Sequence, residues 1–293
     1  MSPSTHNTIA RLKSRTMFSL CVFATLLILS VLVVITGYLV SIGAKSLELG
    51  QLLEFKVPPF FSELPTGDPH HPGGMKHAIV GSAILIGLAS LIGIPLGMLA
   101  GIYLAEYDTG SWIAAPVRFV ADVLAGVPSI VVGILGYELL VVPLGGYNGW
   151  AGAAALAFIM VPISARTTEE MLRLVPNSYR EASMALGASK ARTIVQVVLP
   201  AATGSLVTGV MLAIARVAGE TAPLLFTAGL SRYIQTDPSK NFPSLTAQIF
   251  EFAKHPTPAT QNLAWGGILV LITLIFVLNL AIRFITRSRS PGK

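Results

Sequence analysis

Long apolar runs separated by short polar segments dominate this sequence. A helix rises about 1.5 Å per residue, so about 20 apolar residues cross the roughly 30 Å hydrocarbon layer of a bilayer. Six runs approach or exceed that length, and they cover residues 18–42, 78–104, 117–142, 150–165, 201–230 and 263–285. The fourth run is the shortest of them. The pattern predicts an all-α integral membrane protein with six transmembrane helices.

Small residues and prolines are frequent inside these predicted spans. Glycine lets helix backbones approach closely in lipid, where no hydrophobic effect drives helices together. Proline removes a backbone donor and can kink or break a helix. The glycines of the second run are Gly81, Gly87, Gly93, Gly97 and Gly101, and prolines lie within or at the edges of spans at Pro95, Pro128, Pro162 and Pro223. We expect a tightly packed bundle of irregular helices.

Two longer polar segments separate the spans on one side. Residues 43–76 are rich in proline and glycine and predict an irregular loop. Its adjacent histidines, His70 and His71, are expected to be solvated and not metal ligands. In residues 231–262, apolar positions at i, i+4, i+7 and i+8 follow Ser244 as a possible cap, and they are Leu245, Ile249, Phe252 and Ala253. They predict a short amphipathic helix that lies either on the lipid surface or against a partner.

The basic residues predict the orientation, because Lys and Arg collect in cytoplasmic loops. With the N-terminus inside, thirteen of the 20 Lys and Arg residues face the cytoplasm. Arg216 lies within a span, and the remaining six are outside: Lys45, Lys56, Lys76, Arg232, Lys240 and Lys254. Both termini are therefore expected in the cytoplasm, and the first run is expected to be an uncleaved signal anchor.

Composition narrows the class of protein further. With 53% hydrophobic and only 12% charged residues, the chain is unsuited to a soluble fold. Its formal charge of +6 does not indicate nucleic-acid binding, because the basic residues flank apolar runs and are not interleaved with aromatic ones. The single cysteine, Cys21, allows no intrachain disulfide.

The longest inside loop carries the first candidate site. Ser178 and Glu181 have the spacing of a capping box, and Gly187 is a plausible helix stop. One face of this short helix would present Tyr179, Ala182, Ser183 and Leu186, and a second helix should start near Ser189 and run toward Pro200. So short a helix needs a surface to dock on, either a cleft in another protein or the lipid surface.

The residues of this loop resemble the EAA loop of ABC importer permeases. Glu181, Ala182 and Ser183 are followed by Gly187 at the family's spacing and then by Val197, Leu199 and Pro200. Ser183 stands in place of the second alanine of the pattern, and Val197 in place of its isoleucine. The resemblance implies that this loop is the coupling helix that docks on an ATPase subunit, with Tyr179, Glu181, Ala182, Ser183, Leu186 and Gly187 at the contact.

The second candidate site is Arg216 with Glu220, near the middle of the fifth run. A charge inside the membrane costs at least about 2.5 kcal/mol, so it must be paired or face water. On a continuous helix the i, i+4 spacing would place both groups on one face. The pair either neutralises itself to order the bundle, or it presents a guanidinium to a passing anion while Glu220 orients it.

Longer stretches resemble the PstA-type permease subunit of bacterial phosphate-specific ABC importers. They are PLGMLAGIYLAEY from Pro95, PSIVVG from Pro128, RTTEEMLRLVP from Arg166 and IARVAGETAPLLFTA from Ile214. The resemblance implies a type I (MetI-like) importer fold and a heterodimeric pore with a PstC-type permease. It also implies two PstB-type ATPase subunits and a periplasmic PstS-type phosphate-binding protein. By the same resemblance Arg216 and Glu220, and with less weight Arg166, line the substrate pathway.

We therefore expect a permease subunit of the bacterial inner membrane that carries inorganic phosphate and uses no cofactor. Its organisation would be a tail at 1–17, a first helix at 18–42, a periplasmic loop at 43–76, a permease domain at 75–285 with its coupling loop at 166–200, and a tail at 286–293. The sequence has no Gly-rich loop ending in Gly-Lys-Ser/Thr, no His-Glu-x-x-His and no recognisable nucleophile, so ATP hydrolysis should belong to partners. The alternatives are an ion-coupled secondary anion transporter, which would favour several buried acids, and a membrane enzyme.

Overall fold

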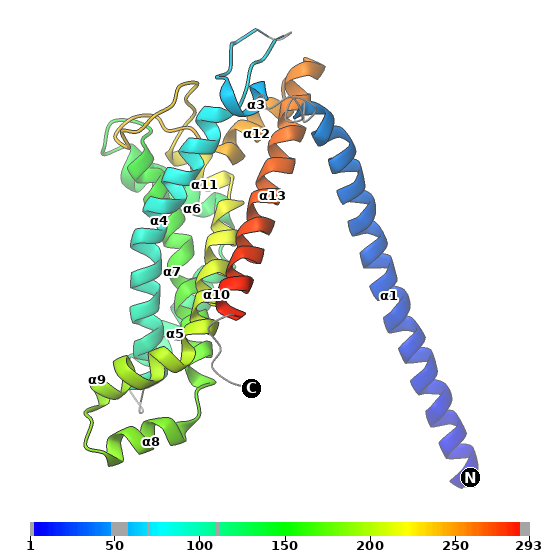
Figure 1. Ribbon diagram of the computed structural model, residues 1–293, viewed down its shortest axis with the longest axis vertical. Coiled ribbons are helices and arrows are strands. Elements are labelled where there is room, and N and C mark those ends of the chain that lie inside the picture. The colour runs from blue at the N-terminus through cyan, green and yellow to red at the C-terminus, as the bar shows by residue number, and fades with distance from the viewer. Residues whose placement is uncertain (1–2, 48–57, 69–70, 109–111, 288–293) are drawn as a thin grey trace.

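The computed structural model describes residues 3–47, 58–68, 71–108 and 112–287 of the chain. Within these residues the fold is helical, apart from an isolated bridge between Pro65 and Gly73. The five long helices are α1 (Pro3–Ser46), α4 (Lys76–Ile102), α7 (Gly149–Arg173), α10 (Leu199–Ala218) and α13 (Pro258–Arg287). In Figure 1, α4, α7, α10 and α13 form a bundle, whereas α1 leans away and approaches α13 only near its own C-terminal end.

The described residues contain five helices that are long and apolar enough to cross a membrane, and a sixth span if one bent pair is counted as a single crossing. The pair consists of α5 (Ala114–Gly126) and α6 (Ser129–Gly136) with the π-helical turn η2 (Tyr137–Val141), and it is bent by 100°. Pro128 lies at the bend, where its ring and missing N–H interrupt a helix. With this pair counted as one crossing, the described helices include six candidate spans, as predicted, and the third one is broken.

The fourth span is longer than the sequence predicted. The helix α7 begins at Gly149, where the Asn148 side chain accepts a 2.8 Å hydrogen bond from the N–H of Ala151. It continues to Arg173, eight residues beyond the end of the predicted run at 165. The added turns carry charged residues that the hydropathy pattern assigned to a loop. Three of them, Arg166, Glu169 and Arg173, are joined by ion pairs in the structure.

The fifth span is also corrected, because the predicted run at 201–230 is not one helix. The helix α10 ends at Ala218, and a separate short helix, α11 (Ala222–Thr227), begins after a break at 219–221. Pro223 in the first turn of α11 lacks the N–H that a continuous helix would need there. At its other end the span begins earlier than predicted, at α9 (Lys190–Thr193) and the π-helical turn η3 (Ile194–Val198).

The bundle is held most closely along α4 and α7, where glycines allow the two backbones to meet. A methyl group added at Gly97 would lie 2.5 Å from the Cβ of Ser164, and one at Gly101 would lie 2.5 Å from the carbonyl oxygen of Ala165. Leu85, Leu156 and Met160 fill the core beside this contact, with Phe242 and Val217. The glycine-rich second run thus serves close helix packing, as expected.

At one end of the bundle, the α12 end, α12 (Leu245–Ala253) folds as predicted. It follows Ser244, but the serine side chain makes no capping hydrogen bond. Leu245 is buried with Met75, and Ile249 and Phe252 pack against the same cluster. The apolar face of α12 therefore lies against α4 and α13 of the same chain, not on lipid or on a partner as predicted.

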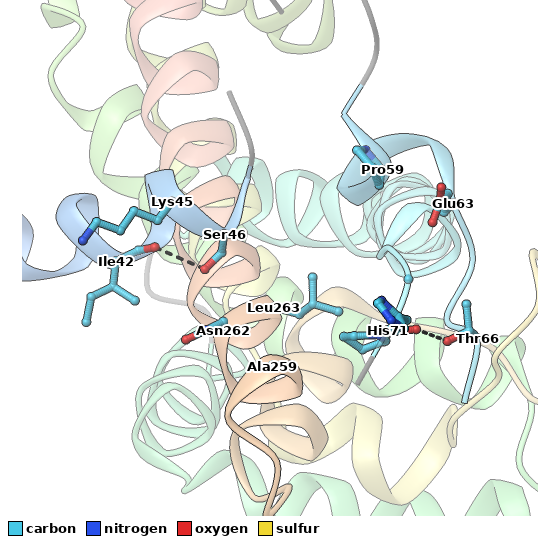
Figure 2. Close-up of a pocket in the computed structure, with 12 residues that line it drawn as sticks. Ile42, Lys45, Ser46, Pro59, Glu63, Thr66, His71, Ala259, Asn262 and Leu263 are labelled. Atoms are coloured by element: carbon cyan, nitrogen blue, oxygen red, sulfur yellow. Dashed lines mark hydrogen bonds between the residues drawn. The ribbon is translucent and has the colours of Figure 1, made fainter. Parts of the chain in front are cut away.

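A cavity of about 710 Å³ lies where α1, α13 and the loop around α3 (Pro59–Ser62) meet, near the same end. Figure 2 shows Lys45 and Ser46 of α1 on one side and Glu63 and His71 of the loop on the other, with Leu263 between them. Among the described side chains, no group of three or more His, Cys, Asp or Glu could hold a metal ion. His70 lies outside the described residues.

Candidate functional site

The predicted coupling loop forms a two-helix elbow at the end of the bundle opposite α12, which we call the α8 end (Figure 1). The helix α8 spans Asn177–Ala185, and Gly187 follows its cap residue Leu186. The φ of +85° at Gly187 is a backbone conformation suited to glycine. The N–H of Ala188 donates to the carbonyl of Ser183 across this turn. The predicted stop at Gly187 is therefore confirmed.

The N-terminal end of α8 differs from the prediction. Its cap position is Pro176, and no side chain caps the helix, so Ser178 and Glu181 form no capping box. Pro176 cannot continue the preceding helix, and it places the start of α8 one residue before Ser178. Glu181 instead lies exposed on the surface of α8. The second helix does start near Ser189, whose side chain accepts a hydrogen bond from the N–H of Arg192.

The face of α8 that sequence spacing assigned to docking is open in this chain. Tyr179, Ala182 and Leu186 are exposed, and Leu186 reaches 89% exposure. No residue of α8 is buried. Ser183 is only partly exposed, and its hydroxyl lies 2.9 Å from that of the buried Thr193 on α9. The serine that departs from the EAA pattern thus joins the two helices of the elbow.

Arg216 and Glu220 are separated by the break in the fifth span. Arg216 lies in the last turn of α10 and is exposed, whereas Glu220 lies beyond the helix end. Because Glu220 does not belong to a helix, the prediction that both residues occupy one helix face is wrong. The described residues also show no ion pair between them. The break itself is anchored to the rest of the fold, because the Thr246 hydroxyl donates a 2.9 Å hydrogen bond to the Glu220 carbonyl.

Arg166 lies within α7 and not at the end of a span. Its guanidinium pairs with Asp122 of α5 at 3.1 Å and with Glu169 at 3.2 Å. Glu169 is 1% exposed and also accepts from Arg118 at 2.7 Å and from Arg173 at 2.8 Å. Three arginines from two helices therefore surround one buried carboxylate, which we call the Glu169 cluster.

The sequence analysis did not predict this cluster, although the spacing of its residues on α7 could have indicated part of it. Arg166 and Arg173 lie three residues before and four residues after Glu169, which places all three on one helix face. Arg118 is 51 positions away, and no local pattern connects it to Glu169. Glu106, which is 8% exposed, is a second buried acid that was missed.

Comparison with known proteins identifies the family. Residues 93–291 match the family described as "Binding-protein-dependent transport system inner membrane component". The chain is 49% identical over 213 residues to the phosphate transport system permease protein PstA of Yersinia pestis, covering 73% of this chain and 72% of that one. It is 38% identical over 287 residues to the PstA protein of Pasteurella multocida, covering 98% and 99% of the two chains.

The fold has solved counterparts. A chain of the MetNI methionine ABC transporter, in an inward-facing conformation, superposes with a TM-score of 0.61 at 19% identity, over 74% of this chain and 97% of that one. At this identity the likeness concerns the fold alone, and it agrees with the expected MetI-like architecture. This chain therefore belongs to the family of binding-protein-dependent transport system inner membrane components, as a multi-pass inner membrane protein of the PstA type.

Proposed function

We propose that this chain forms one half of a transmembrane pathway for inorganic phosphate and that separate ATPase subunits drive it through α8. Its relatives are phosphate transport permeases, and its family is that of binding-protein-dependent transport systems. In the proposed assembly, a PstC-type permease completes the pore and two PstB-type ATPases bind at the α8 end. A PstS-type phosphate-binding protein docks at the α12 end. The α8 end and both termini would then face the cytoplasm.

The observation that carries this proposal is the surface of α8. A nine-residue helix with no buried side chain and an exposed apolar face has little reason to be ordered in isolation. Tyr179, Ala182 and Leu186 give it the pattern of an amphipathic helix that lies in a groove of another protein. Glu181 on the exposed surface of α8 and the glycine stop at Gly187 complete the residues that we assign to ATPase coupling.

Arg216 is the residue that we assign to the anion. It lies at the end of a helix in an apolar span, and it has no ion-pair partner among the described residues. A guanidinium that its own chain does not neutralise can offer a planar fork of donors to a phosphate oxygen. Glu220 at the break and Arg166 near the α8 end complete the pathway residues. Arg166 contributes less positive charge, since two carboxylates bind it.

Reconstitution tests the transport function directly. The chain would be placed in proteoliposomes with its candidate permease, ATPase and binding-protein partners, and radiolabelled phosphate uptake would be followed with and without ATP. We expect uptake that requires ATP and all partners. Uptake driven by an ion gradient without ATP would instead support a secondary transporter and refute the proposal.

Variants at Arg216 test the pathway assignment. The Arg216→Gln, Glu220→Gln double variant removes both charges and should assemble normally but lose uptake. Exchanging the two residues should also fail, whereas Arg216→Lys should keep partial activity, because Lys retains the charge without the bidentate fork. Near-normal uptake by the double Gln variant, at equal membrane abundance, would remove Arg216 from the pathway.

A further inference from the structure

We propose that Arg180 and Glu106 form a mechanical junction that ties α8 to the second and fourth spans, so that movement of α8 is passed to the bundle through this pair. The proposal rests on the proposed coupling function of α8. It adds two positioning residues that do not belong to the exposed docking face.

Glu106 is placed by an irregular end of the second span. The helix α4 passes into η1 (Tyr103–Tyr107), a π-helical turn. Such turns insert an extra residue, turn the side chains that follow, and are frequent at functional sites. Here the Glu106 carboxylate is buried, although it lies at the end of an otherwise apolar helix. A buried carboxylate must be paired or hydrogen-bonded to be tolerated.

The partner of Glu106 is Arg180, which comes from α8. The Nη2 of Arg180 lies 2.5 Å from the Oε1 of Glu106, and its Nε lies 3.1 Å from the Oε2. The same guanidinium donates to the carbonyls of Leu172 at 2.9 Å and Val175 at 2.7 Å, at the C-terminal end of α7. Carbonyls at a helix C-terminus favour a cation. One side chain therefore joins three elements: η1, α7 and α8.

The rest of α8 is attached weakly. It buries no residue of its own, and its other described side-chain hydrogen bond to a neighbouring helix is the one between Ser183 and Thr193 of α9. That second contact stays within the elbow and does not reach the second or fourth span. Force applied to α8 by a docked partner reaches the fourth span also along the chain, because residues 174–176 connect α7 directly to α8. It would reach the second span chiefly through the rigid, planar guanidinium of Arg180.

A cavity beside the Arg180–Glu106 pair gives these two side chains room to move without disturbing the packed core. A cavity of about 440 Å³ is lined by Glu106 and Arg180, with Asn177, Lys190 and Arg173 around it. Lys190 of α9 lies 4.8 Å from the ring centre of Tyr107, at the last residue of η1. A small displacement of α8 can therefore carry Arg180, and Glu106 with it, while the apolar contact between α4 and α7 remains closed.

The test is a double-mutant cycle on the full transporter in proteoliposomes. Glu106→Gln, Arg180→Gln and the double variant would be compared with wild type for ATP hydrolysis and for phosphate transported per ATP. Removing a charge-assisted contact should lower the population of the joined state about tenfold or more, with a similar fall in the phosphate-to-ATP ratio. ATP hydrolysis should persist. The double variant should be no worse than the single variants, because both act through one contact.

Controls separate this junction from other effects. Arg15→Gln removes an exposed guanidinium from α1 and should leave the ratio unchanged. Arg180→Lys should restore part of the ratio, since it retains the charge but not the fork. A wild-type assembly without ATP-driven uptake would refute the proposed function. If the wild type transports phosphate and the Gln variants keep its phosphate-to-ATP ratio, the junction alone is refuted. Failure of both Gln variants to assemble would also refute the junction, since the pair would then serve folding.

Discussion

Neutralising Glu169 should destabilise the chain more than any single surface charge change. Glu169 is 1% exposed and receives Arg118 and Arg173 on Oε1 and Arg166 on Oε2. The Glu169→Gln variant keeps the side-chain shape. If its amide oxygen takes the place of Oε1, its NH₂ group faces the guanidinium of Arg166, and two donors then meet where a carboxylate accepted.

The magnitude follows from how far each arginine is shielded from water. Removing one member of a buried ion pair costs about 3 to 5 kcal/mol. Arg173, whose side chain is 55% exposed, can rehydrate, and Arg166 retains Asp122. Arg118 retains Asp108 at 2.5 Å. The cost should therefore lie near the lower end, about 3 kcal/mol, which corresponds to a fall of about 6 to 12 °C in melting temperature.

The assay is thermal unfolding of the detergent-solubilised chain at a fixed scan rate, because unfolding of such proteins is often irreversible. Glu170→Gln is the matched control, since Glu170 is the next residue along α7 and is exposed. Equal melting temperatures for Glu169→Gln and Glu170→Gln would refute the argument.

Three further predictions concern the whole chain and its loops. The purified chain should neither bind nor hydrolyse ATP, and turnover that survives rigorous removal of any copurifying ATPase would contradict this. In a Cys21→Ala background, an impermeant thiol reagent added outside cells should label Glu63→Cys but not Ser178→Cys, and the reverse result would invert the proposed orientation. Gly187→Leu should leave membrane insertion intact but uncouple ATP hydrolysis from uptake. A Cβ at this position meets no atom within 4 Å, but Leu is strained at a φ of +85°. Normal uptake by this variant would show that the turn at Gly187 plays no part in coupling.

Most of the fold could be predicted because membrane spans are a matter of length and composition. The six apolar runs all correspond to helices, and α8 and α12 begin within two residues of the position that their side-chain spacing indicated. These features depend on periods of a few residues, which a single sequence displays. The family resemblance rested on equally local motifs, and the comparisons confirm it.

Two of the errors, in the fourth and fifth spans, share one physical cause, which is contact between distant residues. The extension of α7 to Arg173 depends on Glu169, and Glu169 depends on Arg118 of another helix. The break after Ala218 is stabilised by a hydrogen bond from Thr246, 26 positions beyond Glu220. The hydropathy pattern predicted a loop at 166–173 and a continuous span at 201–230. It could not include the contacts with Arg118 and Thr246, because both residues are distant in sequence.

The distribution of paired and unpaired charges gives a physical reason to separate structural from transport residues. Glu106 and Glu169 are buried, and arginines from neighbouring elements bind both of them. A charge satisfied within its own chain has little free energy left to offer a ligand, because any new contact must first replace an existing one. Arg216 differs, since it has no ion pair among the described residues and lies beside a break in its helix. A cation left in this state inside an apolar span requires water, a partner or a passing anion to offset its cost. The same argument weakens the secondary-transporter alternative, since guanidinium groups already hold the carboxylates of both buried acids.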